Sequence, residues 1–213
     1  DKYPHLRQLS KVPTFALTYA GTWTTLVKNA GLTKKTAIEI EKAYHELYSV
    51  SDKWVENKLK EATKTGFVEL AFGVKLRTPI LNYTVTGNKY TPHLASAEGR
   101  TAGNALGQSY GLLTNRACME FMNQVRNSQD KYDIHPVAQI HDAIYLLIKE
   151  DINILKYTND NLIKAMNWQD DPNIYHDKVK LDAELAVYYP NWSSEIILKN
   201  NISTKEIYNT INK

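Results

Sequence analysis

Cysteine is nearly absent from the sequence, since Cys118 is the single thiol among 213 residues. No disulfide can therefore form within the chain, which suits a reducing compartment, and the helix-like surroundings of Cys118 predict a buried, unreactive thiol. No apolar stretch approaches the roughly 20 residues that a membrane-spanning helix needs, and no secretory signal is visible. We therefore expect a cytoplasmic protein that has no membrane partner.

A large excess of one charge is also absent. Lysine and arginine number 26 against 23 acidic residues, a net charge of only +3, and 43% of the residues are hydrophobic. This composition supports a substantial core in one or two domains. It permits a nucleic-acid partner but requires that such a partner meet a local basic patch.

Periodicity and turn residues predict a mixture of helices and short strands. Helices are expected over residues 5–19, 33–64 (one helix or two, ended by Gly66), 95–127 (capped by Ser96) and 151–167. Hairpins are expected over 67–81, turning near Gly73, and over 137–148, with a strand over 178–189. The second hairpin is expected to pair with this strand at 179–187. Residues 82–94 are expected to form a loop, and the tail from Lys199 is expected to fray.

The most informative segment is residues 137–148, VAQIHDAIYLLI, in which two apolar runs flank His141 and Asp142. A tight turn between two strands would hold Asp142 at the tip of a rigid element. A carboxylate in that place suits magnesium, which prefers oxygen ligands and keeps several waters. The alternative is an ordinary turn, because Asp is a common turn residue.

Two polar stripes follow from a spacing of four residues, which places side chains along one side of a helix. The first combines cations with aromatic rings and comprises Arg7, Lys11, Phe15 and Tyr19. It could hold a triphosphate at its cationic end, with the rings beside a sugar and a base. The alternative is an amphipathic helix with a solvated basic end. Pro13 predicts a kink or a late helix start.

The second stripe comprises Arg100, Asn104 and Gln108. Its amides offer donors and acceptors suited to base edges in the minor groove. Small neighbours would let a large ligand approach the helix backbone; these are Ala102, Gly103, Ala105 and Gly107. The alternative is a solvent-facing side of a helix that packs through its leucines.

Together these segments resemble family A DNA polymerases. RQLSKVPTFALTYAG (7–21) resembles the family's fingers helix, GRTAGNALGQ (99–108) its minor-groove helix, and QIHDA (139–143) the palm motif with a metal-binding Asp. GFVELAFGVKLRTP (66–79) resembles a segment between the first two motifs, and the strand at 179–187 with Asn191-Trp192 resembles the family's closing strand. The motifs occur in the family's order, and the likeness extends to about residue 198.

The resemblance implies an α+β right-hand polymerase fold, with helical fingers over 1–92 and the C-terminal part of the palm over 93–213. Its partners would be primer–template DNA and deoxynucleoside triphosphates. Arg7 and Lys11 would contact phosphates, with Phe15 on the sugar and Tyr19 near the templating base. The second stripe would contact DNA, and Gln139 and His141 would lie by the primer terminus. Asp142 would bind the catalytic Mg²⁺ pair, so that Asp142, Lys11 and His141 form the catalytic set.

Three departures from the family pattern stand out. Ala20 precedes Gly21 where the family has glycine directly after the tyrosine, and Ala143 replaces a glutamate after His-Asp. No counterpart of the family's first catalytic Asp motif is present. We therefore expect a fragment or a split subunit that needs an N-terminal polymerase portion as its partner and has no activity alone.

Two alternatives remain at the level of sequence. A portion of a single-subunit RNA polymerase has a similar Arg-Lys-Tyr-Gly helix and His-Asp hairpin, but the Arg-Asn-Gln helix favours a DNA polymerase. A non-catalytic nucleic-acid-binding module would use the two polar helices without metal. The sequence as a whole resembles a phage replicative enzyme, and the location of such an enzyme would be the host cytoplasm.

Overall fold

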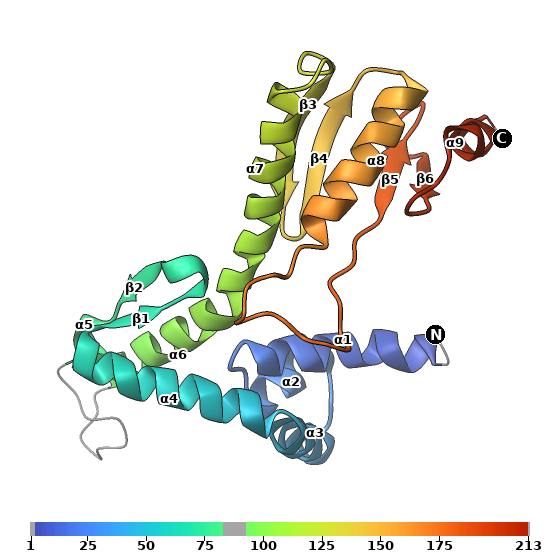
Figure 1. Cartoon of the computed structure of the whole chain (residues 1–213). Coiled ribbons are helices and arrows are strands. Elements are labelled where there is room, and N and C mark those ends of the chain that lie inside the picture. Colours follow the sequence, from blue (N-terminus) through green and yellow to red (C-terminus); the bar gives the residue numbers. More distant parts are fainter. Residues whose placement is uncertain (1–2, 83–92, 213) are drawn as a thin grey trace. The chain divides into compact units, whose positions relative to one another are not determined.

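The structure, a computed structural model, describes residues 3–82 and 93–212. The chain forms two compact units, Asp1–Tyr110 and Gly111–Lys213. Both combine helices with small antiparallel sheets, which confirms the α+β class (Figure 1). Most of the predicted loop at 82–94 lies outside the described residues. No helix in the described part of the chain is both long and apolar enough to cross a membrane.

The first unit is mainly helical. Its elements are α1 (Pro4–Thr18), α2 (Trp23–Ala30), α3 (Lys34–Leu47), α4 (Ser49–Thr65), β1 (Phe67–Glu69), β2 (Lys75–Arg77), α5 (Pro79–Asn82) and α6 (His93–Gln108). The predicted helix at 33–64 is two helices, and α2 was not predicted. Gly66 ends α4 in the left-handed conformation, with φ 78°, and the β1–β2 hairpin turns at Gly73 as predicted.

Two apolar clusters hold this unit together. Leu17 of α1, Leu26 of α2 and Ala37 of α3 form one of them, and a 2.9 Å hydrogen bond between Thr18 Oγ1 and the Tyr44 hydroxyl joins α1 to α3. The second cluster lies between α4, the β1–β2 hairpin and α6, and its buried members are Ala62, Val68, Ala102 and Leu106.

The end of α1 accommodates the unusual Ala20. The Ala20 N–H donates to the Leu17 carbonyl (3.0 Å) and the Gly21 N–H to the Ala16 carbonyl (2.8 Å), the paired bonds of a Schellman cap. Ala20 occupies the left-handed position with φ 57°, where glycine is usual. Glycine is required at position 21 for a different reason, because a Cβ there would lie only 2.5 Å from the carbonyl oxygen of Ala16. The turn therefore forms, with strain at Ala20.

The second unit contains the remaining elements. They are α7 (Leu112–Arg126), β3 (Ile134–Ile140), β4 (Ala143–Ile148), α8 (Ile152–Met166), β5 (Leu185–Tyr188), β6 (Glu195–Leu198) and α9 (Thr204–Ile211). The prediction of one helix over 95–127 is wrong, because a 3₁₀ turn at Ser109–Gly111 separates α6 from α7. Ser96 is not a cap, since it lies inside α6.

The core of the second unit lies where α7 and α8 pack against the β3–β4 hairpin (Figure 1). Phe121 of α7 and Ile134 of β3 are fully buried in it. Half-buried Cys118 packs on the same cluster, and burial raises the pKa of its thiol, which keeps the thiol protonated. Arg116 of α7 donates to the carbonyl of Ala165, which lies at the end of α8 (3.1 Å). The guanidinium carbon of Arg116 lies 3.8 Å from the centre of the Trp168 ring.

Our prediction that hairpin 137–148 pairs with the strand at 179–187 is wrong. Among the described residues, β3 and β4 form one two-stranded sheet, while β5 pairs with β6 in another. The expected strand at 178–189 is reduced to Leu185–Tyr188. The unit has a second core cluster, whose buried members are Leu155, Leu198, Ile202 and Ile207. The two sheets meet through side chains, because Leu185 and Ile148 each pack on both clusters.

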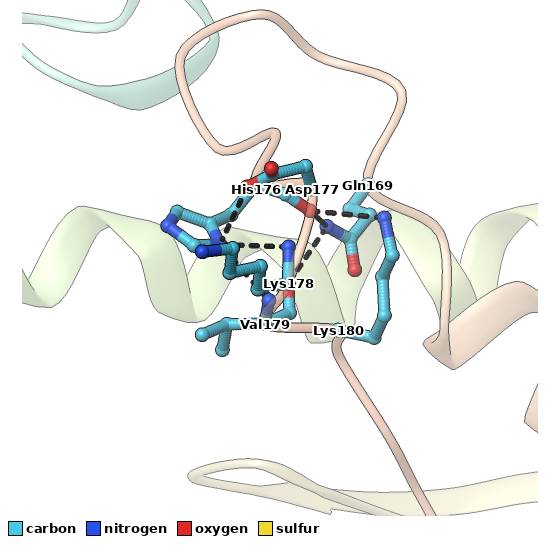
Figure 2. Close-up of polar contacts among 6 residues, drawn as sticks. All are labelled: Gln169, His176, Asp177, Lys178, Val179 and Lys180. Carbon is cyan, nitrogen blue, oxygen red and sulfur yellow. Dashed lines mark hydrogen bonds and ion pairs between the residues drawn. The ribbon is translucent and has the colours of Figure 1, made fainter.

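Side-chain acceptors explain why residues 178–181 do not form a strand (Figure 2). His176 Nδ1 accepts the N–H groups of Lys178 (3.1 Å) and Val179 (2.9 Å), and Oε1 of buried Gln169 accepts the Leu181 N–H (2.7 Å). Backbone donors satisfied in this way are not available for a strand ladder. Local polar contacts thus override the alternating pattern.

The expectation of a frayed tail is also wrong. Ser203 and Glu206 form a capping box that opens α9, and Ile207 is fully buried. Hydrogen bonds from the Ser203 hydroxyl and N–H lower the pKa of the Glu206 carboxyl. The Ser-x-x-Glu spacing was visible in the sequence and predicts this helix start.

The cap of α1 predicts that Ala20→Gly stabilises the protein. Glycine removes the cost of the left-handed backbone conformation, about 1–2 kcal/mol. The larger conformational entropy of glycine in the unfolded chain offsets about 0.5–1 kcal/mol of this gain. Thermal or denaturant unfolding should show a gain of about 0.5–1 kcal/mol. Ala43→Gly, at an exposed position inside α3, is the matched control and should lose about 1 kcal/mol. Equal losses for both variants would contradict the assigned cap.

Candidate functional site

The β3–β4 hairpin turns through His141 and Asp142. Ile140 pairs with Ala143, so these two residues form the whole loop, as the sequence predicted. His141 adopts φ 54°, which is uncommon for a residue other than glycine. Backbone strain of this kind occurs at functional sites, where surrounding structure holds it in place. Packing of the hairpin on α7 and α8 provides that support here.

Asp142 is exposed at the tip of this turn. No described residue forms a hydrogen bond or an ion pair with its carboxylate. Both oxygens are therefore available to a hard cation, and a carboxylate with waters matches the ligand preference of magnesium. Ala143, in place of the family's glutamate, adds no further acid beside it.

Gln139 precedes the turn by two residues and has a partner that the sequence did not reveal. Its Nε2 donates a hydrogen bond to Oδ1 of Asn115, in the first turn of α7. The two residues are 24 positions apart, so no local pattern could have indicated this contact. The structure therefore gathers Gln139, His141 and Asp142 at one end of the hairpin.

The cationic and aromatic stripe lies on the exposed side of α1. The buried residues of this helix are Pro13 and Leu17, and at 100° per residue the stripe is centred on the opposite side. Phe15 is 58% and Tyr19 47% exposed. The helix starts at Pro4 and continues through Pro13, so the late start is wrong. The stripe in full is Arg7, Lys11, Phe15 and Tyr19.

The second stripe lies on α6 in the same way. Arg100 and Gln108 are exposed and Asn104 is half-buried, whereas Ala102 and Leu106 face the core on the opposite side. No described residue forms a hydrogen bond or an ion pair with the three polar side chains. This stripe is thus available to a ligand.

Part of the interpretation of the small residues is wrong. Ala102 is buried in the core cluster, and a Cβ on Gly103 would lie 3.3 Å from Val55 Cγ1 of α4. These two residues allow α4 and α6 to approach each other, whereas a Cβ on Gly107 would meet no atom within 4 Å.

The two stripes belong to the first unit and the Asp142 turn to the second. Within the described residues, no group of three or more His, Cys, Asp or Glu side chains is placed to hold a metal ion. The roles of the individual residues therefore remain predictions.

Comparison with known proteins defines the class. The sequence profile described as DNA polymerase family A matches residues 2–194. The chain belongs to this family. No curated protein matches the chain in sequence.

The fold is similar to a solved polymerase structure, described as the POL domain of Pol1 from M. smegmatis in complex with DNA primer–template and dNTP. The TM-score is 0.64 at 18% sequence identity, and the match covers 84% of this chain. It covers 29% of that chain, so the present sequence spans less than a third of its length. The likeness establishes the fold.

Proposed function

We propose that this chain forms the fingers (1–92) and the C-terminal part of the palm (93–213) of a polymerase that extends a DNA primer along a template. The observation that carries the proposal is the carboxylate of Asp142, which has no partner among the described residues and lies on a two-residue hairpin turn, in a chain that matches family A over residues 2–194. The reaction joins the primer 3′-oxygen to the α-phosphorus of a deoxynucleoside triphosphate and releases pyrophosphate.

The stripe on α1 would bind the incoming nucleotide. Arg7 and Lys11 bind the triphosphate, since guanidinium and ammonium groups form charge-assisted hydrogen bonds with phosphate oxygens. Phe15 packs on the sugar and Tyr19 lies near the templating base. The exposure of this side of α1 supports these roles, because the packing of the helix leaves the whole stripe accessible.

DNA would bind through the second stripe and the palm turn. Arg100, Asn104 and Gln108 face outward from α6 and contact primer and template in the minor groove. Gln139 and His141 lie by the primer terminus. His141 holds the strand end next to Asp142, because the two residues share the turn.

Asp142 would be one carboxylate ligand of a magnesium pair. The bound ions would lower the barrier by neutralising charge on the reacting phosphate. The second carboxylate would come from a polymerase portion outside this chain, which is therefore its predicted partner. The 213-residue chain alone would have no stable magnesium site and no activity, because one carboxylate binds magnesium weakly.

The family match favours a DNA polymerase over a single-subunit RNA polymerase. Comparison of ribo- and deoxynucleotide incorporation by the complete enzyme tests this choice. We place the enzyme in the cytoplasm, and in the host cytoplasm if the polymerase is of the phage type.

Asp142→Asn should abolish nucleotide incorporation by the complete polymerase while the fold is kept. The loss should be at least about a thousandfold, because several kcal/mol of charge stabilisation through the metal disappears. Unfolding temperature should stay constant, since the side chain has no described partner. Asp170→Asn, another exposed acid in the same unit, should keep full activity. An active Asp142→Asn enzyme would refute the assignment.

Lys11→Ala in the complete polymerase should reduce kcat/KM for the incoming nucleotide. A charge-assisted phosphate contact worth roughly 1.5–3 kcal/mol is lost, which corresponds to about 10- to 150-fold. Lys28→Ala, an exposed lysine at the end of α2, serves as the control. Unchanged kinetics for Lys11→Ala would mean that the stripe is only a solvated side of α1.

Phe15→Tyr should relax discrimination against dideoxynucleotides. A tyrosine hydroxyl at this position would take the place of the missing 3′-hydroxyl of a dideoxynucleotide, and phenylalanine has no such hydroxyl. The ratio of kcat/KM for a normal and a dideoxy nucleotide should be large in the original enzyme and fall in the variant. Equal use of both nucleotides by the original enzyme would show that α1 is wrongly aligned.

A further inference from the structure

The contact between Gln139 and Asn115 joins the tip of the palm hairpin to the start of α7. Gln139 stands opposite Ile144 in the hairpin, and Ile144 packs on the core formed with α7 and α8. Residues opposite each other in an antiparallel pair share a face of the sheet. Gln139 therefore lies on the helix side of the hairpin, where Asn115 can reach its amide.

This hydrogen bond determines which end of the Gln139 amide is exposed to a ligand. A carboxamide presents a carbonyl acceptor and an NH₂ donor, and free rotation lets it offer either one. Because Nε2 of Gln139 is bound to Oδ1 of Asn115, Oε1 is directed away from that partner. No described residue donates a hydrogen bond to Oε1. The second N–H of Nε2 stays available as a donor, but the bond to Asn115 fixes which way Oε1 faces, so that Oε1 is an oriented acceptor.

An acceptor in the minor groove has one complementary base group. The minor-groove edges of A·T and T·A pairs carry only acceptors, whereas a G·C pair adds the 2-amino donor of guanine. Oε1 of Gln139 could therefore bind guanine but none of the other bases on that edge.

We propose that Asn115 is a positioning residue that holds Gln139 as an acceptor for the guanine 2-amino group in the primer-terminal base pair. This proposal rests on the proposed function, which puts Gln139 at the primer terminus. It adds a residue of α7 to the site and a preference for G·C over A·T at the primer end.

Extension of three matched primers by the complete polymerase tests the proposal. The primers end in guanine, in hypoxanthine (guanine without its 2-amino group) and in adenine, each opposite its pairing base. The original enzyme should extend the guanine primer about five- to tenfold more efficiently than the hypoxanthine primer, the usual effect of one hydrogen bond. Asn115→Leu should bring this ratio close to one and leave the hypoxanthine and adenine primers unchanged.

Two further variants separate positioning from simple structural support. Asn115→Asp keeps the acceptor and cannot donate, so it should retain the guanine preference; a loss would show that Asn115 acts as a donor. Gln139→Leu should abolish the preference, and Asn115→Leu added to it should have no further effect. Circular dichroism and unfolding temperature verify that each variant is folded.

Each remaining outcome is decisive. An equal loss of extension efficiency on all three primers in Asn115→Leu would show that the contact between Asn115 and Gln139 only supports the hairpin. Unchanged extension of every primer would show that this contact has no role in primer recognition. A ratio of one in the original enzyme would overturn recognition of guanine. Failure of the original complete polymerase to extend any primer would instead overturn the proposed function, and this inference with it.

Discussion

Packing of the β3–β4 hairpin against α7 and α8 is the constraint on which the candidate palm site depends. Phe121 and Ile134 are fully buried where these elements meet, and truncating a core phenylalanine of this kind costs about 3–5 kcal/mol. This burial fixes the hairpin register. The register in turn determines that the loop has two residues, so that His141 carries the strain and Asp142 is at the tip.

The same relation between burial and display governs the first unit. The buried sides of α1 and α6 are small, formed by Pro13 and Leu17 in one helix and chiefly by Ala102 and Leu106 in the other. Each helix therefore presents its opposite side to ligands. Gly103 contributes by letting α6 pack close to α4, which anchors the second polar stripe without using any of its side chains.

Polar side chains determine the structure where the apolar pattern does not. Gln169 and His176 satisfy backbone N–H groups that an extended strand would have used, and so residues 167–184 form an irregular but hydrogen-bonded connection; Figure 2 shows the bonds around His176. Asn115 has a comparable effect on Gln139, because it fixes which atoms of the amide face outward. The contact of Gln139 with Asn115 joins residues 24 positions apart, whereas His176 binds residues two and three positions ahead of it.

The family, the mixed fold class, the two helical stripes and the two-residue turn that carries Asp142 could all be predicted from the amino-acid sequence. These features follow from local spacing: side chains four apart align on a helix, and two strand-forming runs around a short polar pair form a hairpin. The Ser-x-x-Glu box of α9 is an equally local signal.

Which elements pair and which amides are oriented depends on the folded chain. The pairing of β5 with β6 and the bond from Gln139 to Asn115 depend on groups brought together by folding. The backbone of residues 178–181 had both an alternating pattern and nearby side-chain acceptors, and hydrogen bonds to Gln169 and His176 prevailed. Part of this competition is local, since His176 lies two and three residues from its donors, but Gln169 reaches Leu181 only because the chain folds back on itself.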